Sequence, residues 1–192
     1  MTKIINLYGS PSTGKSTLAS GLFYKMKIAG FNVELADEWI KSKVFEEAPY
    51  PFTDQLYTFA KQNKRLNQLK GKADYVICDS PLLQICVYKS HEPEIFDEMA
   101  LAYYNRYDNI NIFLHRDHEF RQEGRVHNEE QSKEIEIQIE QMLDKYNIPY
   151  MNMQTTGALD TLYNMIYLAD KNEKDNKPII HSPQEAREGV LI

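Results

Sequence analysis

The feature that most constrains this chain is a nine-residue stretch close to its first residue. Residues 9–17 read Gly-Ser-Pro-Ser-Thr-Gly-Lys-Ser-Thr, which is the G-x-x-x-x-G-K-[ST] pattern of a phosphate-binding loop. An apolar run over residues 4–8 precedes the pattern, and apolar residues at helical spacing follow it from Leu18. Because a strand, a loop and a helix occur in this order, the sequence predicts a P-loop that binds the phosphates of a nucleotide.

The residue types in this loop suit anion binding. Glycines let the backbone curl so that successive N–H groups point inward, and the next helix adds the positive end of its dipole. We expect Lys15 to reach the β- and γ-phosphates of ATP, Ser16 to bind Mg²⁺ and Thr17 to offer a second hydroxyl. The predicted nucleotide-binding residues are Gly9, Ser10, Pro11, Ser12, Thr13, Gly14, Lys15, Ser16 and Thr17. The alternative is an ordinary glycine-rich turn that opens a helix.

Length and charge narrow the class of protein. A chain of 192 residues fits one α/β domain with a sizeable core. The net charge of −6 gives no general attraction to nucleic acid or to an anionic membrane. Cys78 and Cys86 have neither a disulfide nor a metal-ligand pattern, which favours a reducing compartment. With no charged-then-apolar leader and no apolar run of bilayer length, we expect a cytoplasmic protein, in the host cytoplasm if a phage encodes it.

Apolar runs of strand length alternate with segments of helical spacing, which predicts a parallel, doubly wound sheet. We expect strands at 4–8, 32–36, 75–78, 110–114 and 149–153. We expect helices at 18–29, 37–45, 54–70 with Thr53 as N-cap, 94–107, 129–146 and 158–169, and a helical segment from Ser80-Pro81. The predicted fold is a P-loop NTPase, a three-layer sandwich with a five-stranded parallel sheet. It divides into a domain over 1–170, with a mobile arginine-rich lid over 116–128, and a polar tail over 171–192.

Acidic residues follow two of the predicted strands. Asp79 ends the apolar run 75–78 and resembles a Walker B acid, which would hold Mg²⁺ together with Ser16. Asp37 and Glu38 follow the second strand, and either carboxylate would take the proton of an attacking hydroxyl. A turn-forming Asp before Ser-Pro and an acidic first helical turn are the alternatives.

Three arginines mark the predicted lid. Arg116, Arg121 and Arg125 would clamp the phosphates bidentately, with Arg116 and Arg121 on the nucleotide and Gly124 as a hinge. A solvated run of charges is the alternative. The spacing of His115, His118 and His127 matches no usual metal-ligand set, so solvated histidines are the simpler interpretation.

The helix predicted over 54–70 carries a weaker signal. Gln55, Gln62 and Arg65 border one face, and Tyr57 and Phe59 add aromatic surface. Amides together with aromatic rings suit a nucleobase, but a plain amphipathic helix explains the same residues equally well.

These motifs together resemble the P-loop nucleoside and nucleotide kinases, and among them the bacteriophage kinases that include the 5-hydroxymethyldeoxyuridine DNA kinases. The resemblance covers roughly residues 3–150 and rests on residues 7–17, Gly21-Leu22-Phe23-Tyr24, Asn32-Val33-Glu34-Leu35, Asp54-Gln55, Asp79-Ser80-Pro81-Leu82-Leu83 and Gly124-Arg125. One position departs from it: Ala36-Asp37-Glu38-Trp39 stands where Thr-Glu-Tyr or Pro-Glu-Tyr is expected.

The resemblance implies an ATP-dependent kinase with Mg²⁺ as cofactor. Its acceptor would be a nucleoside-like hydroxyl, including the hydroxymethyl group of a modified pyrimidine in phage DNA. A free nucleoside or nucleoside monophosphate is the alternative acceptor, and an ATP-binding regulatory NTPase is the alternative function. Modified DNA is thus a candidate partner, no membrane partner is expected, and a homodimer is compatible with the sequence.

Overall fold

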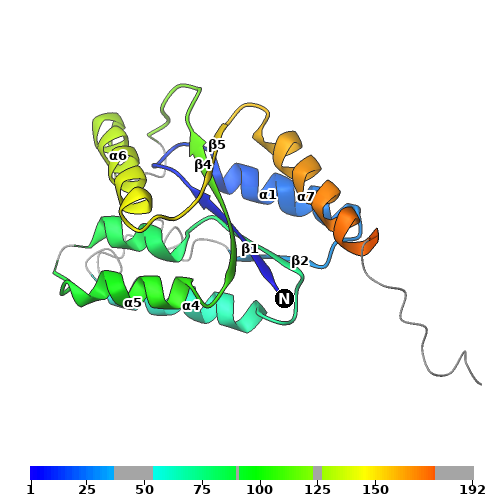
Figure 1. Ribbon diagram of the computed structural model, residues 1–192. Coiled ribbons are helices and arrows are strands. Elements are labelled where there is room, and N and C mark those ends of the chain that lie inside the picture. Colours follow the sequence, from blue (N-terminus) through cyan, green and yellow to red (C-terminus); the bar gives the residue numbers. More distant parts are fainter. Residues whose placement is uncertain (37–53, 90, 123–126, 176–192) are drawn as a thin grey trace, which may run out of the picture.

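A computed structural model describes residues 1–36, 54–89, 91–122 and 127–175 of the chain, in which strands and helices alternate (Figure 1). The strands are β1 (Lys3–Tyr8), β2 (Val33–Ala36), β3 (Tyr75–Cys78), β4 (Asp108–His115) and β5 (Met151–Gln154). The helices are α1 (Lys15–Ile28), α4 (Gln55–Leu69), the 3₁₀ helix η1 (Leu82–Tyr88), α5 (Ile95–Tyr104), α6 (Glu129–Lys145) and α7 (Ala158–Asp175).

The strands form one five-stranded sheet in the order β2-β3-β1-β4-β5, and every neighbouring pair is parallel. β2 and β3 lie on one side of β1, and β4 and β5 lie on the other. Ligands bind to open α/β sheets at the carboxyl ends of the strands where the connections diverge in this way. The loop that follows β1 is therefore at the usual binding position, and the predicted α/β fold is confirmed.

Two layers of helices cover the sheet, as Figure 1 shows: α1 and α7 on one face, and α4, η1, α5 and α6 on the other. Side chains of β1 alternate between the layers, so that Ile5 and Leu7 pack with α1 while Ile4 and Tyr8 pack with the opposite helices. Strands buried on both faces need apolar residues in both alternations, which explains the continuous apolar runs in the sequence. In the described ranges, no helix has both the length and the apolar character that a membrane span requires.

A buried asparagine network interrupts the apolar layer between the sheet and α5. Asn6 Nδ2 donates to Asn109 Oδ1 at 2.9 Å and to Asn111 Oδ1 at 3.0 Å. Asn111 Nδ2 in turn donates to the Tyr104 hydroxyl at 2.8 Å and to the Pro149 carbonyl at 2.9 Å. The network ties the centre of the sheet to α5 and to the turn before β5, because each buried amide finds its partners only in this arrangement.

Several predicted boundaries differ from the structure. Helix α1 begins at Lys15 rather than Leu18, since Gly14 adopts a left-handed φ of 84° and the helix starts directly after it. The N-cap of α4 is Asp54 and not Thr53, because Asp54 Oδ1 accepts a 2.8 Å hydrogen bond from the Tyr57 N–H.

The last helix also differs from the prediction. Helix α7 continues to Asp175, so that the first five residues of the predicted tail, 171–175, are helical. The helix predicted over 37–45 and the rest of the predicted tail, 176–192, lie outside the described residues.

The asparagine network generates a stability prediction. Asn111→Ala should lower the free energy of unfolding by about 3 kcal/mol, because it removes three hydrogen bonds and leaves buried partners unsatisfied. Tyr104→Phe removes one hydroxyl of the same network and should cost about 1 kcal/mol. Denaturant titration of both variants checks the ranking, and equal losses would contradict the assigned network.

Candidate functional site

The loop between β1 and α1 has the backbone of an anion-binding nest. Gly9, Ser12 and Gly14 have positive φ angles of 143°, 69° and 84°. Where residues with positive φ alternate with residues of negative φ, successive N–H groups turn toward the same side. The first N–H groups of α1, from Lys15 onward, have no acceptor within the helix and face the same end. The loop can therefore bind a phosphate through its main chain.

The outward-facing oxygens of the loop are held by surrounding elements. The Pro11 carbonyl accepts from Ser132 Oγ at 2.8 Å, and Thr155 Oγ1 lies 2.8 Å from the Thr13 carbonyl. The remaining contacts are Gln84 Nε2 to the Gly9 carbonyl at 3.2 Å, Arg121 N–H to Ser12 Oγ at 3.0 Å, and Ser10 Oγ to Glu136 Oε2 at 3.2 Å. Helices η1 and α6, the segment after β4 and the turn after β5 thus clamp the loop on its outer side.

Lys15 spans the mouth of the loop. Its Nζ donates to the Gly9 carbonyl at 2.6 Å and to the Ser10 carbonyl at 2.9 Å. Thr13 Oγ1 donates to the same Ser10 carbonyl at 2.9 Å. The ammonium group therefore lies over the residues whose amides form the nest, where it adds a full positive charge to the dipole of α1.

Asp79 lies at the carboxyl end of β3, next to this loop. Cys78 pairs with Asn6 of β1 and with Ala36 of β2, so β3 ends level with β2 and two residues before the end of β1. The Asp79 side chain is 5% exposed. Mg²⁺ in nucleotide sites is held by one or two carboxylates or hydroxyls together with phosphate oxygens and water. The buried carboxylate of Asp79 and the hydroxyl of Ser16, in the first turn of α1, fit this donor set.

Sequence comparison assigns the family. The AAA domain family matches residues 4–159, which span the strand–loop–helix unit and the sheet described above. The chain belongs to the AAA domain family. A search of curated proteins by sequence found no match.

The fold of this AAA domain is similar to that of two solved nucleotide-metabolising kinases. A deoxyadenosine kinase from M. mycoides, described with the products dCMP and dCDP bound, has a TM-score of 0.53 and 16% identity, with 88% of this chain and 99% of that chain covered. A thymidylate kinase from Ehrlichia chaffeensis has a TM-score of 0.54 and 14% identity, with 80% and 88% covered. At sequence identities this low, the comparison shows similarity of the fold alone.

The predicted lid arginines of the AAA domain have different surroundings. The side chain of Arg116 is 9% exposed, donates to Glu129 Oε1 at 3.3 Å, and lies over the Phe120 ring. Arg121 meets the loop through its main chain, while its residue is exposed. Arg125, like Gly124, lies outside the described residues, so the role of the three arginines as phosphate clamps stays a prediction.

Of the predicted residues on α4, Gln55, Phe59 and Gln62 are buried at helical spacing, whereas Tyr57 and Arg65 are exposed. Gln62 is buried and its Nε2 lies 3.2 Å from Cys78 Sγ, next to Asp79, and Arg65 donates to the Leu35 carbonyl. Phe59 instead packs edge-on against Phe96 and Tyr103. The Gln62 amide therefore lies at the carboxyl end of β3, while Phe59 belongs to the packing between α4 and α5.

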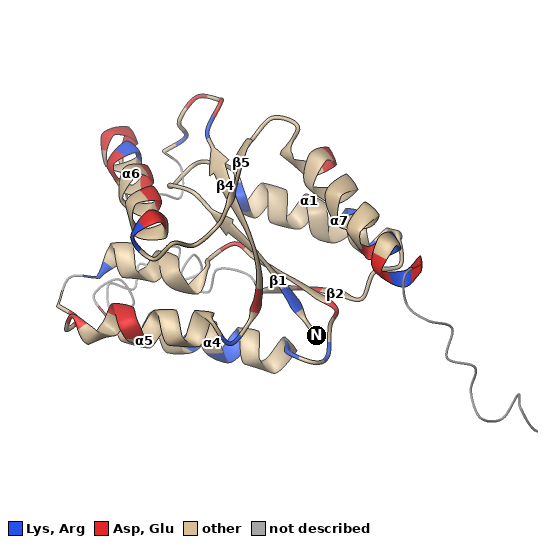
Figure 2. Cartoon of the chain, viewed as in Figure 1, with Lys and Arg blue, Asp and Glu red and all other residues tan. Residues whose placement is uncertain are grey.

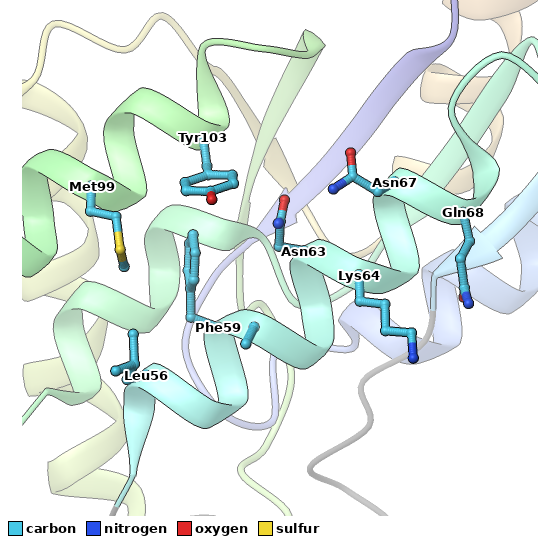
Figure 3. Close-up of a pocket in the computed structure, with 9 residues that line it drawn as sticks. Leu56, Phe59, Asn63, Lys64, Asn67, Gln68, Met99 and Tyr103 are labelled. Atoms are coloured by element: carbon cyan, nitrogen blue, oxygen red, sulfur yellow. The ribbon is translucent and has the colours of Figure 1, made fainter.

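Figure 3 shows the groove between α4 and α5, which has a volume of about 460 Å³. Its lining is Leu56, Phe59, Ala60, Asn63, Lys64, Asn67, Gln68, Met99 and Tyr103. None of the predicted phosphate or metal residues lines it, so this groove is separate from the P-loop.

Several residues of the site have no signal in the sequence. Ser132, Thr155 and Gln84 touch the loop from positions far along the chain, and no spacing rule connects them to it. His118, predicted to be solvated, lies close enough to Gly14 that a Cβ added there would be 3.9 Å from its Nε2. Among the described residues, no group of three or more His, Cys, Asp or Glu side chains could hold a metal ion.

The backbone of the loop generates a prediction at Gly9. Gly9→Ala should lower the free energy of unfolding by about 3 kcal/mol, since its φ of 143° disfavours any Cβ and the added atom would lie 2.8 Å from the Leu114 carbonyl. Gly71→Ala is the matched control, with a φ of 79° and nothing within 4 Å, and should cost about 1 kcal/mol. Thermal unfolding measures both, and similar losses would show that the close approach at Gly9 is unimportant.

Proposed function

We propose that this protein is an ATP-dependent kinase that transfers the γ-phosphate of ATP to a hydroxyl of a nucleoside-like acceptor. The observation that carries the proposal is the clamped P-loop, with Lys15 across its mouth and Asp79 at the neighbouring strand end. A nest, a cation and a carboxylate at one edge of a parallel sheet are the parts that phosphoryl transfer requires. Both fold neighbours, a deoxyadenosine kinase and a thymidylate kinase, are kinases, which supports the same reaction class.

In the proposed reaction the loop amides and Lys15 bind the β- and γ-phosphates and stabilise the charge that develops on them. The acceptor oxygen forms a bond to the γ-phosphorus, the bond from that phosphorus to the β,γ-bridging oxygen breaks, and ADP leaves. Asp37 or Glu38, which follow β2 in the sequence and lie outside the described residues, would take the acceptor proton. Ser16 and Asp79 would hold Mg²⁺, which neutralises phosphate charge when bound.

The acceptor side of this site would be the face of α4 that meets β3. Gln55 and Gln62 are both buried and lie seven residues apart on α4, and Gln62 contacts the residue before Asp79. Amide groups can read the edge of a nucleobase because each carries both a donor and an acceptor. A nucleobase bound along this face would direct its sugar toward the phosphate loop.

For the acceptor we propose a free nucleoside or nucleoside monophosphate. The names of both fold neighbours support a small acceptor, and the net charge of −6 disfavours a DNA duplex. The hydroxymethyl group of a modified pyrimidine in phage DNA is the alternative acceptor, supported by the Asp79-Ser80-Pro81-Leu82-Leu83 run. A regulatory NTPase that binds ATP without an acceptor is the alternative function.

An acceptor panel tests the proposal. Protein incubated with γ-labelled ATP and Mg²⁺ should label at least one nucleoside or nucleoside monophosphate, with hydroxymethylpyrimidine DNA included in the panel. Lys15→Met should reduce this transfer by about two to three orders of magnitude, because it removes the cation at the γ-phosphate. Lys64→Met, a cation in the groove between α4 and α5, is the matched control and should retain full transfer. Labelled free phosphate with no labelled acceptor in any sample would favour the regulatory NTPase.

The proton acceptor can be assigned by amide substitution. Glu38→Gln or Asp37→Asn, whichever removes the general base, should lower kcat by a factor of about 10² to 10⁴ while ATP affinity is retained. The other substitution serves as the control, because it removes the same charge from the adjacent position. If both variants keep wild-type kcat, neither carboxylate is the base.

A further inference from the structure

A carboxylate of α6 lies in direct contact with the phosphate loop. Glu136 Oε2 accepts a 3.2 Å hydrogen bond from the hydroxyl of Ser10, which is fully buried. The carbonyl of Ser10 is one of the two that Lys15 Nζ contacts. An uncompensated carboxylate at this position would repel the phosphates of a bound nucleotide, since like charges interact strongly where solvent is partly excluded.

His115, at the end of β4, pairs with this carboxylate. Its Nδ1 lies 3.0 Å from Glu136 Oε1, and its Nε2 lies 2.9 Å from Asn152 Oδ1. A carboxylate oxygen and an amide oxygen both accept hydrogen bonds, so both ring nitrogens donate when the ring carries two protons. The ring of Phe113 lies 4.9 Å from the His115 ring, and an aromatic face favours a cation. The geometry therefore fits an imidazolium ion.

The surroundings of His115 favour the same state. Partial burial lowers the pKa of His115, but its hydrogen bonds with Asn152 and Glu136 and the negative charges of Glu136 and Glu140 outweigh burial, so that the pKa is raised above its usual value. A histidine with a raised pKa keeps its charge below that pKa and loses it as the pH rises through it.

Other charged groups around the pair come from three elements. Acidic side chains recur along α6 (Figure 2), where Glu140 adds to the field at His115 and Glu129 is paired with Arg116. On the β5 side, Tyr150 has a pKa raised by burial and is neutral near neutral pH. The loop contributes the ammonium group of Lys15. In the described part of the chain, His115 is the histidine that the Glu136 carboxylate contacts directly.

We propose that protonated His115 neutralises Glu136 beside the phosphate loop and thereby sets the affinity for ATP, so that ATP binding weakens as His115 loses its proton. This inference rests on the proposed function, since it concerns the same triphosphate site. Linkage gives a reciprocal expectation: bound ATP should raise the pKa of His115, because the phosphates favour the charged ring.

The test is the affinity of magnesium-bound ATP measured by calorimetry from about pH 5.5 to about pH 8.5. Wild-type affinity should fall by about fivefold across this range as the compensating charge is lost. Glu136→Gln should bind ATP at least as tightly as wild type at high pH and should lose most of the pH dependence. His115→Gln should bind ATP with the high-pH affinity of wild type throughout.

The matched control is Glu134→Gln, which removes the same charge from an exposed position of α6 and should keep the wild-type pH profile. Protonation of ATP itself changes the measured affinity equally for every variant. A difference in pH profile between variants therefore reports on the pair of His115 and Glu136. NMR titration of the His115 ring gives a second measurement. Without nucleotide, the His115 pKa should be lower in Glu136→Gln than in wild type, and with ATP bound it should rise in wild type. This measurement does not depend on whether His115→Gln folds.

Two outcomes would overturn the inference. If wild type and Glu136→Gln bind ATP with the same pH profile, the pair has a packing role and does not set affinity, while the proposed function stands. If wild type binds no ATP at any pH, the proposed function fails and the inference fails with it.

Discussion

The structure depends on holding the tightly curled loop between β1 and α1 in place. Gly9 and Gly14 adopt positive φ angles readily, whereas Ser12, with a φ of 69°, does so at a cost that the surroundings of the loop must offset. Here the carbonyls of Gly9, Pro11 and Thr13 accept hydrogen bonds from Gln84, Ser132 and Thr155 respectively. Lys15 Nζ also donates to the Gly9 carbonyl from the mouth of the loop, so these carbonyls are hydrogen-bonded while the curled backbone turns successive N–H groups toward one side.

The register of the sheet places residues from distant strands beside the loop. β4 pairs with β1 up to Phe113 and Tyr8, so His115 stands beside the loop, and β5 pairs with β4 up to Gln154, which sets Thr155 next to His115. The Thr155 N–H then donates to the His115 carbonyl at 3.0 Å. A change of one residue in register would move these groups to the opposite face, because side chains alternate along a strand. The apolar side chains buried between the sheet and its two layers of helices fix that register, and with it the distances at the loop.

Sequence patterns predicted the local parts of this molecule well and its tertiary contacts poorly. The strand–loop–helix unit, the parallel sheet and Asp79 at a strand end follow from motifs whose residues lie close together along the chain. Ser132 and Gln84 touch the loop from 121 and 75 residues away, and their residue types are ordinary for any helix. Thr53 is a favoured N-cap by residue type, but Asp54 is the residue at the N-cap position of α4. Residue type alone does not distinguish these two neighbours.

The last feature of the site is the distribution of charged groups around the loop. A protein of net charge −6 that binds a polyanion needs cations concentrated where the phosphates lie, and Lys15 together with the dipole of α1 supplies them. Helix α6 then presents a difficulty, because it must pack against the loop through Ser132 and yet carries acidic residues along its length. Glu136 faces the loop on that packed side, and His115 is the group that meets it. Pairing the carboxylate with a titratable partner rather than with lysine or arginine makes the local field depend on pH, whereas a permanent cation in the same position would have fixed it.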